Sequence, residues 1–385
     1  MQQNQTGASR RAVIRSAGAA AAFAIMPPRA VRGSQANSTL SVGLIGTGNR
    51  GSFDGSIVEA DPRARITAVC DLFDDRIESG VAKIKARNPD VYKDFEKLLA
   101  SDVDAVVIAT PVFEHPRMLE AAVQAGKHVY CEKPAGVDEE GCFRVMRAGR
   151  MAGGKINISF GFQQRGGPVY IEGYRRLKEG QIGELSSARA FWISGQVVTA
   201  PAQPEGPVSW EERIRNWYAY PELCGDSIVE QQCHNFDVLH WFLGGVPVSA
   251  VAYGGRKVRT WRNTMDHVMA CFEWPGGLHV NFEASQVTPP PYRKLGEHFT
   301  GTKGAIEVWR THMSHYKPPK DIETIKSERD ITIDNIEAFL ERVQTGNYEN
   351  VAVRSALSTM IAILGRTAAY RNGEVTWKGL YGVQG

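Results

Sequence analysis

A strand that runs directly into a glycine-rich turn constrains the fold of this chain more than any other feature. Residues 40–45 are mostly apolar, as in a buried strand, and Gly46, Gly48 and Gly51 follow at the spacing G-x-G-x-x-G. In dinucleotide sites the first glycine permits a tight turn, the second lets a pyrophosphate approach the backbone, and the third lets the next helix pack on the strand. That helix would point its free N–H groups at the phosphates. The residues expected to contact a dinucleotide are Gly46, Thr47, Gly48, Asn49, Arg50 and Gly51.

The pattern after this turn alternates strand and helix. Strand-like runs occupy residues 42–45, 66–70, 105–109, 128–131 and 156–161. Helical stretches lie between them at 52–60, 74–87, 94–100, 115–125 and 138–152. Such alternation is typical of parallel strands joined by crossover helices, so we expect a doubly wound Rossmann sheet over residues 37–157.

The pattern changes after residue 160. Consecutive strands are expected at 185–193, 247–258, 266–274, 278–286 and 296–301. Helices are expected at 168–179, 226–243, 331–345 and 353–371. Consecutive strands with few helices between them indicate an α+β domain with an open, mostly antiparallel sheet, over residues 158–385. Two folded domains also agree with the length of 385 residues.

The first 36 residues differ from the rest of the chain in charge. They contain five arginines and no acidic residue, so the remaining residues carry a net charge of −2 although the whole chain carries +3. This mildly acidic body has no basic excess of the kind that binds nucleic acid. Arg10 and Arg11 precede an alanine-rich apolar stretch at 17–26, and residues 34–36 are typical of a cleavage site.

A paired arginine before a weakly apolar stretch is similar to a twin-arginine export signal. We therefore expect residues 1–36 to direct a folded, cofactor-loaded protein to the periplasm or another exported location. The stretch is too short to anchor the chain in a bilayer, so we expect no membrane association after cleavage. A disordered basic tail is the alternative interpretation.

The six cysteines form no C-x-x-C pair. Cys70 and Cys131 fall in expected buried strands, and an exported protein could form disulfides. Their placement favours buried thiols that act as small apolar side chains.

Asp71 ends the second expected strand, about twenty residues after the glycine turn. An acidic residue at this position accepts hydrogen bonds from the adenosine ribose and would repel a 2′-phosphate. NAD is therefore expected rather than NADP, although Arg76 nearby weakens the preference. The alternative is that Asp71 caps the next helix, in a turn that also contains Asp74 and Asp75.

The next strand ends at Thr110 and Pro111, and His115 follows. Because the carboxyl ends of parallel strands meet at one edge of a sheet, we expect Thr110 and Pro111 in the cofactor crevice. His115 is a further candidate there, in competition with a role as a solvated or capping residue.

Glu132, Lys133 and Pro134 directly follow the strand at 128–131. A lysine at this point projects into the same crevice, where it would pair with a substrate hydroxyl and lower the pKa of that hydroxyl. Glu132 would help to orient it, and the proline would stiffen the turn. On spacing alone, a solvated lysine is the competing interpretation.

Residues 40–134 closely resemble the Gfo/Idh/MocA family, whose members include glucose–fructose oxidoreductase and inositol dehydrogenase. The most recognisable mark is the Glu-Lys-Pro motif, here Glu132-Lys133-Pro134, and the similarity continues through residues 161–165 and 180–184. The resemblance implies a Rossmann domain and an open antiparallel sheet with the active site between them. It also implies that Lys133 contacts the nicotinamide ribose and the reacting hydroxyl, that no metal is needed, and that the protein is a homodimer or homotetramer.

The expected helix 226–243 carries four ionisable residues at spacings of four, four and three: Asp226, Glu230, His234 and Asp237. These spacings place them on one helix face. From the residues alone the face could be a solvated acidic surface, a metal site built on Glu230 and His234, or a catalytic group.

The resemblance favours a catalytic group, because the family typically has an Asp four residues before a His on this helix, facing the nicotinamide. Here Glu230 stands in the Asp position, and Gln232 replaces a usual glycine. Histidine suits acid–base chemistry near neutral pH. We expect His234 to take the hydroxyl proton while Lys133 orients the oxygen and Glu230 assists. Which of Lys133 and His234 is the formal base stays open.

Four further residues are expected to contact the substrate with His234: Gln163, Arg165, Trp217 and Tyr218. Aromatic rings together with amide and guanidinium donors suit a sugar. For the two aromatic residues, core packing is the competing interpretation.

These features predict an exported oxidoreductase that moves hydride between NAD and a hydroxyl of a sugar, glycoside or cyclitol. Because free dinucleotide is scarce outside the cytoplasm, we expect the NAD to be tightly bound. One alternative is an NAD-dependent glycosidase that works by transient oxidation and elimination, which would release an aglycone. The other is a dinucleotide-binding sensor that has lost catalysis.

Overall fold

The structure, a computed structural model, describes residues 39–195, 207–289 and 291–382. These residues belong to one compact unit, Thr39–Gly385. The expected export signal at residues 1–36 lies outside the described residues. Within the described ranges, no helix combines the length and the apolar character needed to cross a membrane.

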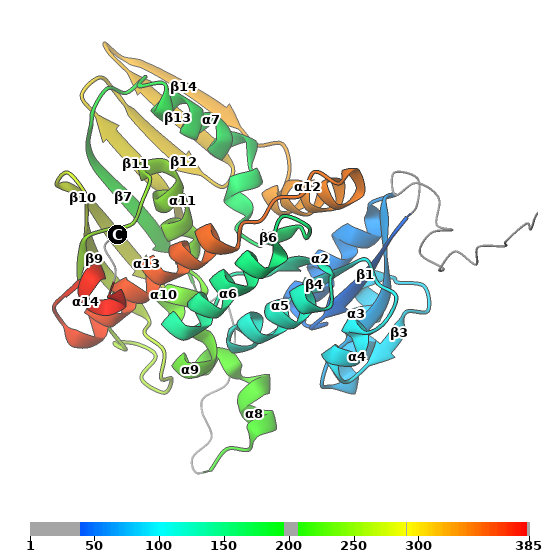
Figure 1. The fold of residues 1–385 in the computed structure, drawn as a ribbon. Helices are drawn as coiled ribbons and strands as arrows, with labels where there is room; N and C mark the ends of the chain where they lie inside the picture. The colour runs from blue at the N-terminus through cyan, green and yellow to red at the C-terminus, as the bar shows by residue number, and fades with distance from the viewer. Residues whose placement is uncertain (1–38, 196–206, 290, 383–385) are drawn as a thin grey trace, which may run out of the picture. The chain divides into compact units, whose positions relative to one another are not determined.

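The N-terminal half is the predicted doubly wound parallel sheet (Figure 1), with six strands where five were expected. Its strands are β1 (Leu40–Ile45), β2 (Ala64–Cys70), β3 (Asp90–Tyr92), β4 (Ala105–Ile108), β5 (His128–Cys131) and β6 (Ile158–Phe160). They lie in the order β3-β2-β1-β4-β5-β6. Strands β2 and β3 are added on one side of β1, and strands β4 to β6 are added on the other side. A doubly wound sheet opens a crevice at its carboxyl edge where the order switches sides, here between β1 and β4.

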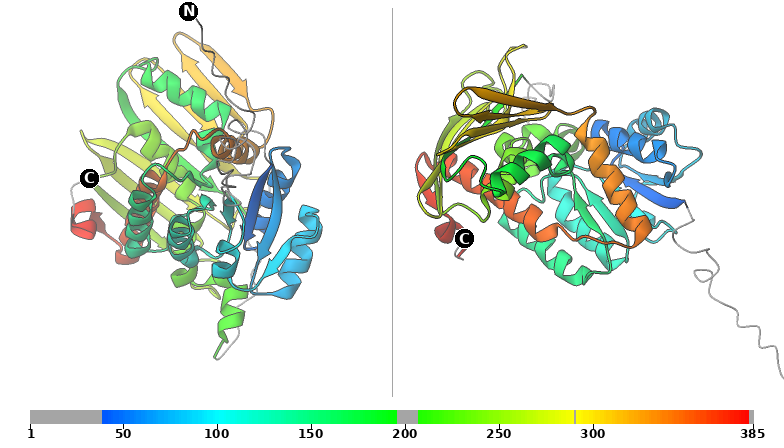
Figure 2. Two further views of the ribbon diagram at one scale, coloured as in Figure 1. Left: turned by 45° about the vertical axis from the view of Figure 1, so that its right-hand side comes forward. Right: turned by 90° about the horizontal axis from the view of Figure 1, so that it is seen from above.

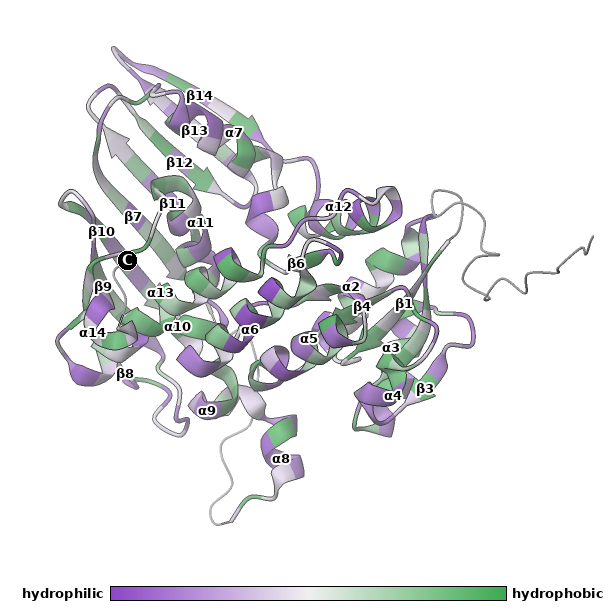
Figure 3. Ribbon diagram, viewed as in Figure 1, coloured by the Kyte–Doolittle hydropathy of each residue, from purple (hydrophilic) through white to green (hydrophobic). Residues whose placement is uncertain are grey.

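Helices cover both faces of this sheet. They are α2 (Asn49–Ala60), α3 (Asp74–Ile84), α4 (Phe95–Leu99), η3 (Val112–Glu114), α5 (His115–Gln124) and α6 (Glu139–Ala152). Figure 3 shows hydrophilic and hydrophobic residues interspersed along α5 and α6, as expected for helices with one face on a sheet. Neighbouring β1 residues enter separate cores, because Leu44 packs with α2 and α3 whereas Ile45 packs with α5 and α6.

The C-terminal half contains a nine-stranded sheet in the order β14-β13-β12-β11-β7-β10-β9-β8-β15. Neighbours pair antiparallel except β7 and β10, which are parallel. The predicted strands are β7 (Leu185–Ile193), β8 (Ser249–Gly255), β9 (His267–Trp274), β10 (Leu278–Ser285) and β11 (Lys294–Gly301). Four more were not predicted: β12 (Ala305–Trp309), β13 (His312–Lys317), β14 (Asp321–Lys326) and β15 (Glu374–Thr376). The mostly antiparallel sheet itself is confirmed.

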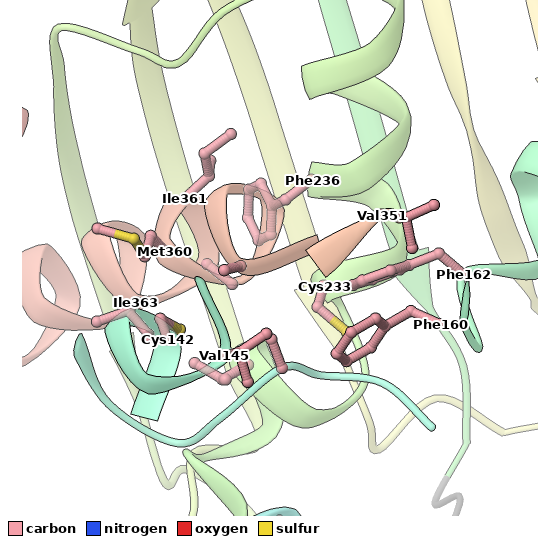
Figure 4. Close-up of a cluster of buried hydrophobic side chains, with 14 of the residues drawn as sticks. Cys142, Val145, Phe160, Phe162, Cys233, Phe236, Val351, Met360, Ile361 and Ile363 are labelled. Carbon is pink, nitrogen blue, oxygen red and sulfur yellow. The ribbon is translucent and has the colours of Figure 1, made fainter. Parts of the chain in front are cut away.

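Short and long helices complete this half. They are η4 (Gln163–Gly166), α7 (Pro168–Lys178), α8 (Trp210–Arg215), η5 (Trp217–Ala219), α9 (Pro221–Cys224), α10 (Ser227–Glu230), α11 (Cys233–Leu243), α12 (Ile331–Thr345), α13 (Ala352–Arg371) and α14 (Trp377–Tyr381). α13 packs against β8 of the second sheet and against α6 of the first. Figure 4 shows part of this shared core, with Cys142 and Val145 from α6, Phe236 from α11 and Met360 from α13. The two sheets are therefore held by one continuous core.

α12 follows strands β7 to β14 of the second sheet in sequence but packs on the first sheet. Phe339 and Leu340 belong to the same core as Val42 and Leu44 of β1. In the view from above, α12 (orange) runs beside the blue N-terminal elements (Figure 2). A helix from the C-terminal half of the chain therefore helps to cover the Rossmann sheet.

Five cysteines are buried and Cys271 is half-buried, and all six are free thiols. Burial raises the pKa of Cys70 to about 12, so its thiol is protonated at neutral pH.

Candidate active site

The glycine turn has the geometry that its sequence predicts. Gly46 has a φ of +92°, in the left-handed region, and a Cβ there would lie 2.6 Å from the carbonyl oxygen of Ala109. A Cβ at Gly51 would collide with the carbonyl oxygen of Gly46. Gly48 is the N-cap of α2 and supplies no side-chain cap. The first turn of α2 therefore has backbone N–H groups to offer to an anion.

Asp71 is held at the end of β2. Its Oδ2 accepts from the backbone N (2.9 Å) and the Oγ1 (3.2 Å) of Thr47, and its Oδ1 accepts from the backbone N of Phe73 (3.2 Å). The N-cap of α3 is Phe73, so Asp71 does not cap this helix. A carboxylate offers about four acceptor positions, which leaves capacity for ribose hydroxyls.

A cleft of about 1240 Å³ runs from this turn to the second sheet. It exceeds the roughly 300–1,000 Å³ of a typical small-molecule pocket, so it has room for a dinucleotide and a second ligand. The predicted residues that line it are Gly46, Gly48, Asn49, Arg50, Asp71, Thr110, Pro111, His115, Glu132, Lys133, Gln163, Trp217, Glu230 and His234. Thr47 and Gly51 do not line it and instead support the turn.

Lys133 and Glu230 form a buried ion pair in this cleft. The Nζ of Lys133 donates to the carbonyl oxygen of Glu230 at 2.7 Å and to its Oε1 at 3.0 Å. Burial alone would lower the pKa of Lys133, but the carboxylates of Glu230 and Glu132 outweigh it, and the pKa is raised. Lys133 is therefore an ammonium at neutral pH.

The helix expected over residues 226–243 is broken into two helices. The prediction that its four ionisable residues share one helix face is therefore wrong. α10 ends at Glu230 and α11 begins at Cys233. Asp226 has a φ of +70° and lies fully buried, where it accepts from the hydroxyl of Tyr370 at 2.7 Å. Asp226 therefore supports the core and does not share a face with Glu230 and His234.

His234 lies in the first turn of α11, with only 4% of its surface exposed. Its ring stacks on Trp192, with centroids 5.6 Å apart, and meets the edge of Phe162. Burial, followed by the positive charges of Lys133 and Arg310, lowers the pKa of His234 well below its usual value. The imidazole is therefore neutral, and its buried Nδ1 has no partner among the described residues.

Comparison with known proteins identifies the family. A family profile described as "Oxidoreductase family, NAD-binding Rossmann fold" matches residues 40–160, and the "GFO/IDH/MocA C-terminal domain" profile matches residues 172–307. The chain belongs to the Gfo/Idh/MocA family. Inositol 2-dehydrogenase 2 of Saccharopolyspora erythraea is 31% identical over 70% of this chain and 73% of that protein.

One more sequence relative and two solved structures are similar to this chain. Inositol 2-dehydrogenase of Rhizobium meliloti is 29% identical over 56% of this chain and 58% of its own. A levoglucosan dehydrogenase in complex with NADH and levoglucosan has the same fold, with a TM-score of 0.74 and 17% identity over 88% of this chain and 99% of its own. Apo scyllo-inositol dehydrogenase from Lactobacillus casei has a TM-score of 0.71 and 18% identity over 88% and 98%. The protein is thus an NAD-dependent oxidoreductase that acts on CH–OH groups.

The described residues fit NAD, the cofactor of the Gfo/Idh/MocA family. A dinucleotide site needs three features, and all three are present. They are a glycine in the left-handed region, a helix start without a side-chain cap at α2, and the strand-end carboxylate of Asp71. Within the described ranges, no group of three or more His, Cys, Asp or Glu side chains could hold a metal ion.

The Glu-Lys-Pro motif of the family is fixed by three connected contacts. The Nε of Arg50 donates to Oε1 of Glu132 at 2.8 Å and lies 3.2 Å from Oδ1 of the buried Asp54. The backbone N of Lys133 donates to Oε2 of Glu132 at 3.1 Å. Arg50, predicted to contact the dinucleotide, therefore also holds the glutamate that precedes Lys133. Burial and the charge of Glu132 raise the pKa of Asp54 well above its usual value.

His115 is buried and connects two strand ends. Its Nδ1 lies 2.8 Å from the carbonyl oxygen of Pro134, and its Nε2 lies 2.9 Å from that of Thr110. His115 has a pKa that burial lowers and that the two carbonyl contacts partly raise again. It fixes the turn that carries Lys133 to the end of β4.

Two of the predicted substrate contacts lie away from the cleft. Arg165 forms a bidentate pair with Asp237, whose Oδ1 also accepts from the hydroxyl of Ser358 at 2.8 Å. Tyr218 is buried, and its hydroxyl accepts from the side chain of Gln286 at 2.8 Å. These side chains are bonded within the protein, whereas Gln163 and Trp217 do line the cleft.

Arg310 and Trp192 are cleft residues that the sequence analysis missed. Arg310 follows β12, and its Nη2 donates to the side-chain oxygen of Gln163 at 3.1 Å when the amide is oriented to match its neighbours. The indole ring of Trp192 stacks on the imidazole of His234. Neither residue belongs to a sequence motif. The one signal was the alternation of side chains along β7, which places Trp192 on the core face.

Proposed function

We propose that this protein oxidises a ring hydroxyl of a cyclitol or sugar to a carbonyl, with NAD as the oxidant. The observation that carries the proposal is the meeting of a charged Lys133 and a neutral His234 in the cleft that begins at the glycine turn. When bound, NAD⁺ supplies the hydride acceptor. The inositol and levoglucosan relatives support a polyhydroxylated ring as the substrate class.

Lys133 would orient the reacting hydroxyl. An ammonium has three N–H donors, and two of them are directed to Glu230. The third would be donated to the hydroxyl oxygen and would stabilise negative charge as the proton leaves. Because Glu230 keeps the pKa of Lys133 high, Lys133 holds its proton and acts as a donor.

His234 would take the hydroxyl proton. A neutral imidazole has one ring nitrogen with a free lone pair, and the burial of His234 keeps it neutral. The C–H bond breaks as the hydride departs, the O–H proton moves to His234, and a ketone remains. This assignment makes His234 the base and Lys133 the electrostatic partner.

The test is a screen of inositols, pyranoses, anhydrosugars and aryl glycosides with NAD⁺ and NADP⁺, followed by the variants Lys133→Met and His234→Asn. Each variant is expected to lose about 10²–10⁴-fold in kcat, with NADH binding retained. Lys155→Met and His279→Asn are matched controls on exposed residues outside the cleft. Unchanged kcat in either catalytic variant would contradict the assigned roles, and release of an aglycone without net NADH would favour the glycosidase alternative.

We also propose that residues 1–36 export the protein through a twin-arginine route. The support is the arginine pair at positions 10 and 11 before the apolar stretch at 17–26. Replacement of both arginines by lysine should retain the protein in the cytoplasm in fractionation experiments. Equal export of the double-lysine variant would count against this route.

A further inference from the structure

A short helix from the C-terminal half, α8, contacts the Rossmann half at the start of α3. The guanidinium of Arg215 pairs with the carboxylate of Asp75 at 3.1 and 3.0 Å, and its Cζ lies 3.8 Å from the ring centroid of Phe73. Glu211, one turn earlier on α8, holds the Nε of Arg215 at 3.0 Å. The guanidinium is thus fixed in place from both halves of the chain.

The other end of α8 makes a second contact. Trp210 meets Phe113 of η3 edge-on, with ring centroids 5.9 Å apart. Phe113 also packs with Trp217 against a small apolar cluster formed by Ala219, Tyr220 and Leu223. A capping box of Ser209 and Glu212 begins α8, so the helix has a defined start.

The two contacts lie on opposite sides of the adenosine end of the cleft. Phe73 follows β2, the strand that ends at Asp71, and Phe113 follows β4 on the other side of β1. Phe73, Phe113, Trp210 and Arg215 all line the cleft together with Asp71. α8 therefore spans the opening between the end of β2, the strand that would bind the ribose, and the end of β4, with β1 between them.

We propose that α8 is part of the dinucleotide site, with Trp210 and Arg215 as cofactor-binding residues that close the adenosine end. Aromatic rings and guanidinium planes are surfaces on which a purine base stacks. Release of the nucleotide then requires that α8 detach from Asp75 and Phe113. The proposal rests on the proposed function only in taking the ligand to be NAD(H). The expected consequence is slow dissociation of the nucleotide, because two contacts must break first.

The test measures the NADH dissociation rate of the full chain by stopped-flow displacement, for Arg215→Ala and Trp210→Ala. Each variant is expected to raise the rate about 10-fold, the effect of losing an exposed ion pair with a cation–π contact or an aromatic pair. Asp75→Asn should reproduce part of the Arg215→Ala effect. Arg175→Ala is the matched control, because Arg175 is an exposed arginine on α7, away from the cleft, with two glutamate partners.

Dissociation rates equal to wild type in both Arg215→Ala and Trp210→Ala, with unchanged Tm, would overturn the proposal and make α8 a docking helix only. Failure of the wild type to bind NADH would also overturn it. No substrate enters this assay, so a failure to oxidise any sugar leaves the result standing and counts against the proposed function alone. A rise in kcat of Arg215→Ala at saturating NAD⁺ would show that NADH release limits turnover in the wild type.

Discussion

Replacement of Glu230 by glutamine is the sharpest probe of how this site sets its charges. The substitution removes the carboxylate 3.0 Å from the Nζ of Lys133 and leaves the backbone carbonyl contact at 2.7 Å in place. Burial still lowers the pKa of Lys133 in the variant, but the largest opposing charge is gone. The pKa of Lys133 should therefore fall, and Lys133 should lose its proton at a lower pH.

The size of this change follows from the contact that is lost. A hydrogen bond between charged groups contributes about 1.5–3 kcal/mol, and about 1.4 kcal/mol corresponds to one pH unit. The alkaline limb of kcat/KM should therefore move down by about 1–2 pH units in Glu230→Gln. In the wild type this limb should lie above the usual lysine value of 10.5, because the pKa of Lys133 is raised.

The assay is the pH dependence of kcat/KM for oxidation of the ring substrate, measured from acid to alkaline conditions. Glu230→Asp keeps the charge and should keep the limb near its wild-type position. Glu222→Gln is a matched control, since Glu222 is an exposed glutamate outside the cleft. An alkaline limb that stays in place in Glu230→Gln would refute the assignment of Lys133 as the protonated donor.

Three further outcomes are expected. Gly51→Ala should abolish NADH binding and lower Tm, because a Cβ there collides with the carbonyl oxygen of Gly46, whereas Gly48→Ala, with open space beside it, should keep its Tm and lose only NADH affinity. Arg310→Met should raise the KM of the ring substrate about 10-fold. It should also move the acid limb of kcat/KM to higher pH, because Arg310 is one of the charges that lower the pKa of His234. An unmoved acid limb would argue against His234 as the base. Burial raises the pKa of Glu297 from its usual 4.5 to about 8, so the wild type should lose up to about 5 kcal/mol of unfolding free energy as pH rises from 4.5 through 8. Urea titrations of Glu297→Gln should lack that loss, and an equal slope in both proteins would contradict a protonated Glu297.

The Rossmann half was predictable because its signals are local. The glycine spacing, the first two apolar strands and Asp71 lie within about 35 residues, and each is a signal that a sequence displays directly. The second sheet was harder. β14 alternates half-buried and exposed residues without a strongly apolar face, so its sequence carries little strand signal. α12 shows its helical period, but nothing in its sequence tells that its apolar face packs on the first sheet.

The residues of the candidate site also divide into those that the sequence predicted and those that it did not. Lys133 and His234 were assigned through the family resemblance, and the structure brings both to one cleft. Arg310 was missed because it acts through a neighbour in space, Gln163, nearly 150 residues away in the chain. Arg165 was placed at the substrate because guanidinium groups suit sugars, yet its Nε and Nη2 pair with Asp237 and it does not line the cleft.

The break between α10 and α11 explains how a site of this kind holds its lysine. In a continuous helix the carbonyl of Glu230 would accept from the backbone N of His234, four residues on. Because α10 ends at Glu230, that carbonyl is free of the helix ladder and accepts from the Nζ of Lys133 instead. The same break makes His234 part of the first turn of α11, where the helix dipole disfavours an imidazolium. One interruption of a helix therefore favours both charge states at once, a protonated Lys133 and a neutral His234. The Gln231-Gln232 pair at the break contains neither Gly nor Pro, so no local signal in the sequence marked this interruption.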